Sequence, residues 1–118
     1  MDPSSSRSDF YFCCRQQGIW PEEISGHRPF ERDWFEPFEP LRNVSASYPP
    51  TLLLHGEADT DVPFEQSVLM AEQLAHHGVV HDFVSDPEWS HAFDFLGASD
   101  PTVQSALDQA LAFLVDRL

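Results

Sequence analysis

The sequence has no lysine and only six arginines in its 118 residues, against twenty aspartates and glutamates. Its formal net charge is therefore −14 at pH 7. Binding of phosphate groups needs clustered positive charge, so we expect neither nucleic acid nor an anionic membrane as a partner. No apolar run approaches the length of a membrane span, and the first residues, MDPSSSRSD, lack the apolar stretch of a signal peptide. A cytoplasmic location is the default expectation.

Cysteine is also scarce, and its placement argues against two kinds of site. The two cysteines, Cys13 and Cys14, are adjacent, so they close no useful loop and form neither a disulfide framework nor a C-x-x-C zinc motif. We expect two small apolar side chains in a reducing compartment. His76 and His77 point in different directions on a predicted helix, so they and His81 do not predict a metal site. No cofactor is expected.

The stretch that organises the chain is residues 48–64, YPPTLLLHGEADTDVPF. Its apolar run predicts a strand over residues 51–55 that is buried on both faces, as parallel strands covered by helices are. Gly56 ends this strand, Asp59 lies in the loop that follows, and Pro63 opens a helix. Open α/β sheets place their chemistry just past the carboxyl ends of parallel strands, so Asp59 is a candidate functional residue.

The rest of the second half repeats this alternation of strand and helix. The pattern predicts a helix over residues 64–77, a second strand over 79–84, a loop over 87–96 and a last helix that follows an Asp100 cap. Residues 51–118 therefore predict an α/β fold, β-α-β-α, with short parallel strands and a right-handed crossover.

The first half has a different composition. Residues 1–8 are polar and serine-rich, and we expect a frayed, disordered lead-in. Residues 9–17 predict one or two turns of helix, although their aromatic density also suits a strand. Six of the ten prolines lie in residues 21–50, interleaved with aromatic residues, and this density forbids long regular elements. We therefore expect residues 1–50 to form an irregular cap or arm.

Asp59 and His91 are the residues most able to carry chemistry. Neighbouring parallel strands end at the same edge of a sheet, so the loops that hold these two side chains should meet there. In a Ser-His-acid triad the carboxylate fixes the tautomer of the histidine, which takes a proton from the nucleophile. The alternative is that Asp59 is a turn residue and His91 an ordinary loop histidine. We expect His55 to be structural, Asp61 to be a loop or helix-start residue and Ser90 to be a loop residue.

The segment PPTLLLHGEADTDVPFEQSVLMAEQLAHHGV, followed by WSHAFD, resembles the carboxyl-terminal third of an α/β-hydrolase of the acetyl-esterase and prolyl-oligopeptidase-like group. In that family the triad acid lies in a His-Gly-x-x-Asp-x-x-Val-Pro pattern, which Asp59 matches and Asp61 does not. The family's histidine loop matches His91-Ala92-Phe93. The resemblance covers nearly all of residues 9–118 and implies a partial α/β-hydrolase fold with Asp59 and His91 as catalytic residues.

The same resemblance implies a substrate class and a missing part. A small ester or a peptide is the implied substrate, and Trp34, Phe35 and Phe38 are candidate substrate-binding residues, unless they only pack on the hydrolase body. The family's nucleophile lies in G-x-S-x-G, and no two of the five glycines here are four residues apart. The oxyanion-hole segment is absent too. We therefore expect these 118 residues to be inactive by themselves.

A sheet of two strands leaves apolar edges unpaired. The chain could form a homodimer through that edge, be completed by another polypeptide that carries the nucleophile, or be a stably folded remnant. Self-association is the leading expectation. The alternative to a hydrolase segment is a non-catalytic interaction module that binds a second copy or a partner through the exposed sheet edge.

Overall fold

The computed structural model describes residues 3–28 and 30–117. The chain separates into two compact units, Met1–Asn43 and Val44–Leu118. The boundary predicted from the sequence, between residues 50 and 51, lies seven residues later. Each unit is described by itself below.

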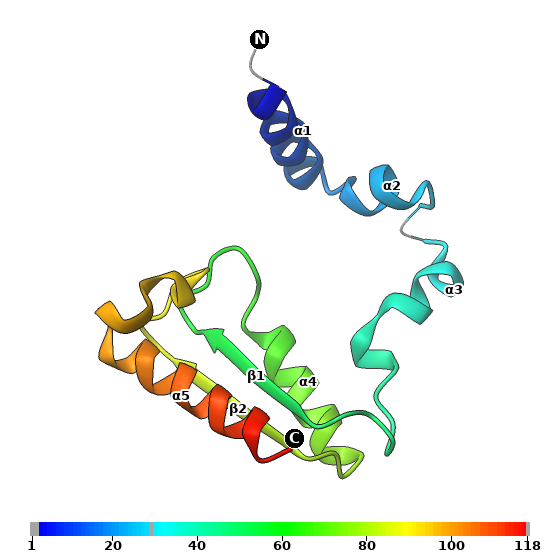
Figure 1. The fold of residues 1–118 in the computed structure, drawn as a ribbon. Coiled ribbons are helices and arrows are strands. Elements are labelled where there is room, and N and C mark those ends of the chain that lie inside the picture. The colour runs from blue at the N-terminus through cyan, green and yellow to red at the C-terminus, as the bar shows by residue number, and fades with distance from the viewer. Residues whose placement is uncertain (1–2, 29, 118) are drawn as a thin grey trace. The chain divides into compact units, whose positions relative to one another are not determined.

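The second unit is built on a two-stranded parallel sheet. Strands β1 (Thr51–Gly56) and β2 (His81–Asp86) pair in parallel with Leu54 opposite Val84, and helix α4 (Glu65–His76) joins them. Figure 1 shows the two strands side by side, with α4 leading from the carboxyl end of β1 back to the start of β2. The predicted α/β class with short parallel strands is confirmed. The second strand starts and ends two residues later than expected.

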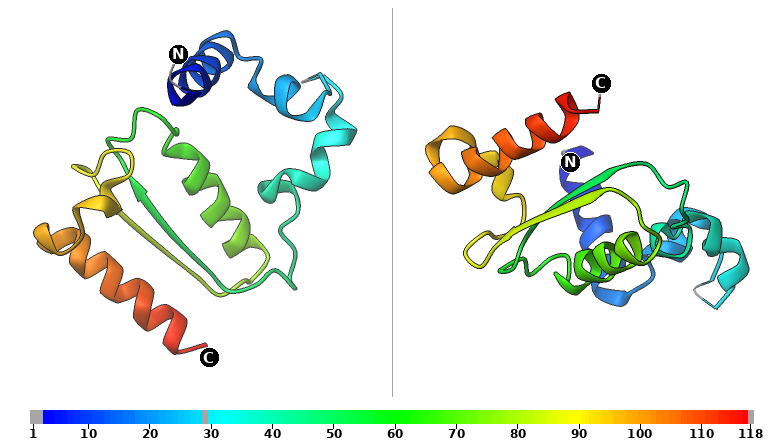
Figure 2. Two further views of the ribbon diagram at one scale, coloured as in Figure 1. Left: turned by 45° about the horizontal axis from the view of Figure 1, so that its top comes forward. Right: turned by 90° about the horizontal axis from the view of Figure 1, so that it is seen from below.

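Helices cover both faces of this sheet, because successive strand side chains alternate between the faces. On one face Leu53 packs with α4 around the fully buried Leu74. On the other face Leu54 and Val84 pack against helix α5 (Pro101–Val115), around the fully buried Val103. In the right-hand view of Figure 2 the strands lie between α4 and α5.

The loop after β2 is more regular than the sequence predicted. The expected loop over residues 87–96 gives way at Phe93 to a 3₁₀ segment, η3 (Phe93–Ser99), which leads into α5. Helix α5 begins as predicted: the Asp100 carboxylate accepts hydrogen bonds from the amides of Thr102 and Val103, and Pro101 occupies the first turn.

In its described residues the first unit has helices and no strand, and those from Trp20 onward, where prolines are dense, are short. Helix α1 (Pro3–Gln17) includes the predicted helix 9–17 but starts within the expected lead-in 1–8, whose first two residues lie outside the described residues. It is followed by α2 (Trp20–Ser25), α3 (Arg32–Phe35), η1 (Glu36–Phe38) and η2 (Pro40–Arg42). In the described parts of the chain, no helix is both long and apolar enough to cross a bilayer.

Candidate active site

Asp59 lies in the loop after β1, where its carboxylate is held by the backbone. Its Oδ1 atom accepts hydrogen bonds from the amides of Asp61, at 2.8 Å, and Val62, at 2.9 Å. The Val62 amide is the largest cause that holds the pKa of Asp59 well below its ordinary value, against partial desolvation, with His91 and the Asp61 amide adding to it. Asp59 is therefore ionised at neutral pH, although its side chain is only 7% exposed.

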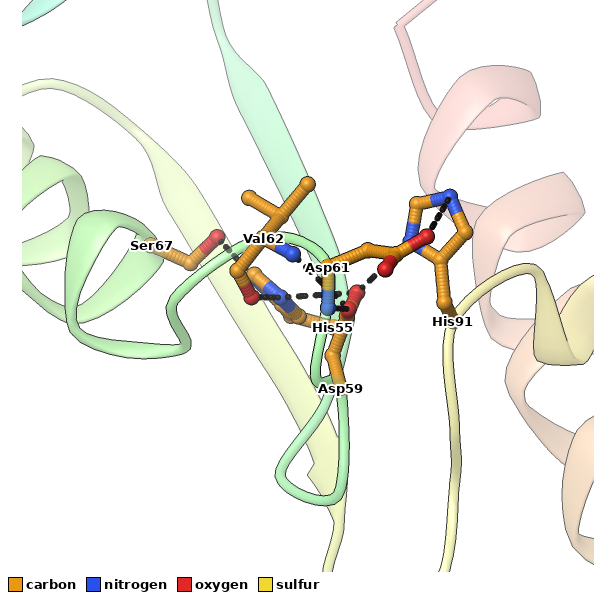
Figure 3. Close-up of polar contacts among 6 residues, drawn as sticks. All are labelled: His55, Asp59, Asp61, Val62, Ser67 and His91. Carbon is orange, nitrogen blue, oxygen red and sulfur yellow. Dashed lines mark hydrogen bonds and ion pairs between the residues drawn. The ribbon is translucent and has the colours of Figure 1, made fainter. Parts of the chain in front are cut away.

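His91 reaches the other oxygen of the same carboxylate. Its Nδ1 lies 3.0 Å from Asp59 Oδ2. Figure 3 shows the two side chains pointing toward each other, Asp59 from the loop after β1 and His91 from the loop after β2. A carboxylate only accepts hydrogen bonds, so the neutral imidazole carries its proton on Nδ1 and leaves Nε2 unprotonated. The His91 side chain is 50% exposed, so Nε2 can take up a proton from a group outside.

Buried aromatic packing fixes the loop that carries His91. The Trp89 ring is 4% exposed and stacks on Phe93 with a centroid distance of 4.2 Å, and its indole N–H donates to Thr102 Oγ1 at 2.9 Å. The Trp89 carbonyl accepts from the Ala58 amide at 3.1 Å and lies so close to Gly56 that a Cβ there would approach it to 2.0 Å. The large Trp89 and Phe93 side chains thus hold the His91 loop in place, and the Trp89 backbone contacts the loop of Asp59.

Two further side chains meet this pair, and the sequence reasoning missed both contacts. Asp61 places a carboxylate oxygen 3.9 Å from His91 Nε2. His55, at the end of β1, brings its Nε2 to 3.4 Å from Asp59 Oδ2. The spacing His-x-x-x-Asp across a strand end was the available signal for the second contact. A hollow of about 380 Å³ borders this group, lined also by Leu54 and Ala92.

The predicted aromatic residues lie in the first unit and cluster there. The Trp34 ring contacts Phe35 and Phe38 at centroid distances of 5.0 and 5.1 Å. The three line an apolar hollow of about 420 Å³ together with Trp20 and Ile24.

The histidines set aside as metal ligands show no such arrangement. His76 and His77 meet edge to face, and His81 Nδ1 lies 2.9 Å from the carbonyl oxygen of Val79. Across residues 3–28 and 30–117, no three His, Cys, Asp or Glu side chains are placed to hold a metal ion.

The chain has a parallel sheet covered by helices, and a carboxylate contacts an imidazole at the carboxyl ends of its strands. This is the arrangement of the last part of an α/β-hydrolase. The comparison with protein families agrees. The chain belongs to the prolyl oligopeptidase family, whose model matches residues 9–118.

Two solved structures are similar to the chain, and both are esterases. Esterase 2 of Thermogutta terrifontis, in a form phosphonylated by sarin, is 28% identical with a TM-score of 0.68, over 87% of this chain and 35% of that one. A truncated carbohydrate esterase from gut microbiota is 27% identical with a TM-score of 0.57, over 70% of this chain and 28% of that one. The chain thus spans about a third of the length of these enzymes. No curated protein matches it.

Proposed function

We propose that this chain is the acid and histidine part of a serine hydrolase, with Asp59 and His91 as two members of a Ser-His-Asp triad. The observation that carries the proposal is the 3.0 Å contact between His91 Nδ1 and Asp59 Oδ2. It gives the imidazole the tautomer and orientation that a general base needs.

In the proposed reaction His91 Nε2 takes the hydroxyl proton of a serine while the serine oxygen attacks the carbonyl carbon of the substrate. The imidazolium then protonates the leaving group, which departs and leaves an acyl-serine ester. A water molecule, deprotonated by the same Nε2, then attacks the ester, and the imidazolium returns the proton to the serine oxygen as the acid leaves. Asp59 remains ionised and stabilises the imidazolium at each stage.

The serine and the oxyanion hole are supplied, in this proposal, by a polypeptide segment outside the 118 residues, which contain no G-x-S-x-G. By themselves these residues are inactive. Both similar structures are esterases, which favours a small ester as substrate over a peptide. Trp34, Phe35 and Phe38 are proposed to line the substrate pocket. The free thiols of Cys13 and Cys14 favour the cytoplasm.

A chimaera tests the function. This chain replaces the segment that matches it in Thermogutta terrifontis esterase 2, and hydrolysis of a nitrophenyl ester is measured together with labelling by a fluorophosphonate probe. We expect hydrolysis and labelling from the chimaera and neither from the 118-residue chain. Asp59→Asn should lower kcat by about 10⁴-fold, because the histidine then takes the wrong tautomer, and His91→Ala should abolish turnover.

His81→Ala is the matched control, since His81 starts the strand that His91 follows. Its chimaera should keep full activity. A His91→Ala chimaera as active as its parent would overturn the proposed role, and a labelled serine in the isolated chain would overturn its inactivity.

A second candidate is a non-catalytic module that forms a homodimer or binds another polypeptide through the sheet edge. In the described part of the chain the sheet has only β1 and β2, so the outer edge of each strand has no strand partner. Light scattering on a sizing column tests it. A dimer that protects the β1 amides from exchange would favour this module, and a clean monomer at low micromolar concentration would exclude its homodimer form.

A further inference from the structure

The Asp59 carboxylate is shared between two imidazoles, and only one of them is explained by the proposed triad. His55 Nε2 lies 3.4 Å from Asp59 Oδ2, the oxygen that also faces His91. His55 is 8% exposed, so its ring cannot exchange this contact for water. Figure 3 shows the carboxylate between the two rings.

The neighbours of His55 determine where its proton is. Its Nε2 faces the Val62 carbonyl oxygen at 3.2 Å and the Asp59 carboxylate, and both groups only accept hydrogen bonds. Nε2 must therefore carry a hydrogen. Its Nδ1 lies 2.7 Å from Ser67 Oγ, and a serine hydroxyl can donate to an unprotonated ring nitrogen. The neutral Nε2–H tautomer satisfies the hydrogen bonds with Val62 and Ser67 and places the N–H beside Asp59 Oδ2.

These contacts connect three elements around Asp59. His55 belongs to the end of β1, Ser67 to the first turn of α4, and Val62 to the loop between them. Val62 is bound twice: its carbonyl accepts from His55, and its amide donates to Asp59 Oδ1. The ring thereby holds the loop that carries the carboxylate, and its Nε2 lies 3.4 Å from the carboxylate itself. Rotation of the Asp59 carboxylate away from His91 would break its contacts with the Val62 amide and with His55 Nε2.

We propose that His55 is a positioning residue for Asp59: its Nε2–H donates to the Val62 carbonyl, which holds the loop of Asp59, and lies beside Asp59 Oδ2, so that the carboxylate stays aimed at His91 Nδ1. The proposal deepens the proposed hydrolase function and rests on it. The two histidines then hold opposite neutral tautomers on one carboxylate, Nε2–H for His55 and Nδ1–H for His91.

Multiple-bond ¹H–¹⁵N correlation spectra of the full 118-residue chain test this arrangement without any enzymatic activity. Spectra are recorded at about pH 8, where a histidine with an ordinary pKa is neutral. We expect the Nε2–H pattern for His55 and the Nδ1–H pattern for His91. His55→Leu, which keeps an apolar volume but has no donor, should cost His91 its Nδ1–H preference. His55→Gln, whose amide can donate from nearly the same place, should preserve it.

His81→Leu serves as the control, because that ring is half-buried on β2 and should leave the His91 pattern unchanged. A folded His55→Leu chain in which His91 keeps the Nδ1–H tautomer would show that His55 only fills space. If His55→Leu does not fold, the wild-type spectrum still decides, since a His55 ring in the Nδ1–H form contradicts the proposal. Ser67→Ala should then lower the Nε2–H population of His55.

The same variants in the esterase chimaera separate this role from the proposed function. His55→Leu should lower kcat at least tenfold with KM unchanged, and His55→Gln should restore most of it. A chimaera without hydrolysis but with the expected tautomers in the isolated chain would remove the function and leave the positioning role. Full hydrolysis by the His55→Leu chimaera would remove the positioning role and leave the proposed function.

Discussion

The two units of this chain satisfy their apolar residues in different ways. In Val44–Leu118 each face of the sheet has a fully buried side chain, Leu74 of α4 on one face and Val103 of α5 on the other. In Met1–Asn43 the only buried apolar side chain among the described residues is Cys14, and eight large hydrophobic residues are exposed: Phe10, Tyr11, Phe12, Trp20, Ile24, Phe30, Trp34 and Phe38.

The difference follows from where each unit gets its hydrogen bonds. The two parallel strands of the second unit are far apart in the sequence, and their sheet carries α4 on one face and α5 on the other. Side chains that are distant in the chain therefore share a core. The helices of the first unit make their backbone hydrogen bonds locally, and neither core cluster of the described residues includes them. The second unit therefore sets the geometry of Asp59 and His91 through its own core, although among the described residues it exposes eight large hydrophobic side chains as well.

The largest expected effect compares a core residue of one unit with an exposed residue of the other. Leu74→Ala should lower the free energy of unfolding of the second unit by about 3 kcal/mol, because it leaves a cavity at a fully buried position. Ile24→Ala, at a side chain that is 66% exposed, should change it by less than about 0.5 kcal/mol. Urea titration followed by the β1 and β2 amide resonances measures both. Equal costs would contradict the division into two units.

A smaller effect compares two glycines. Gly56→Ala should destabilise the second unit by about 2 kcal/mol, since its Cβ would lie 2.0 Å from the Trp89 carbonyl oxygen, which must move. Gly26 ends α2 with φ +74° and nothing near its Cβ position, so Gly26→Ala costs about 1 kcal/mol of backbone strain only. Amide exchange should place the first loss in β1 and β2 and the second in α2. Loss of protection in the strands of the Gly26 variant would contradict this.

Much of the second unit could be predicted because its signals are local. The apolar run at 51–55, the stripe of 64–77 and the Asp100 cap each depend on neighbouring residues, and each lies within one or two residues of its observed element. The 3₁₀ segment from Phe93 was missed, because it depends on the stacking of Phe93 on Trp89, which only the folded loop provides. Helix α1 also began earlier than its polar composition indicated.

The proximity of Asp59 and His91 could be predicted from topology alone, since two parallel strands end at one edge. The contacts of His55 and Asp61 could not. They depend on how the loop 57–63 folds back on the strand end, which is set by two hydrogen bonds from backbone amides to one side-chain oxygen. The catalytic roles of Asp59 and His91 stay predictions.

Acid should affect the second unit through Asp59. Its folded-state pKa is depressed, so its stabilising contribution is complete above the unfolded value of about 3.9 and declines as the pH falls through that value toward the folded one. Urea midpoints of the β1 and β2 resonances between pH 7 and pH 3 should therefore fall with acid, and less steeply in Asp59→Asn. Asp82→Asn, at an exposed carboxylate on β2, is the control. Equal slopes for wild type and Asp59→Asn would contradict the assignment.

The smallest expected effect concerns the backbone beside His91. In both units glycines take up positive φ, Gly18 and Gly26 in the first and Gly78 and Gly97 in the second, but the second unit also places Ala92 at φ 58°, in the left-handed region. Ala92→Gly relieves about 1 kcal/mol of strain but adds a similar conformational freedom to the unfolded chain, so stability should change by less than about 0.5 kcal/mol. Ala75→Gly, within α4, has no strain to relieve and should cost about 1 kcal/mol. Urea titration measures the free energy of unfolding of both variants. A change near zero for Ala92→Gly means that the packing of Trp89 and Phe93 imposes the left-handed turn. A loss as large as that of Ala75→Gly would contradict this.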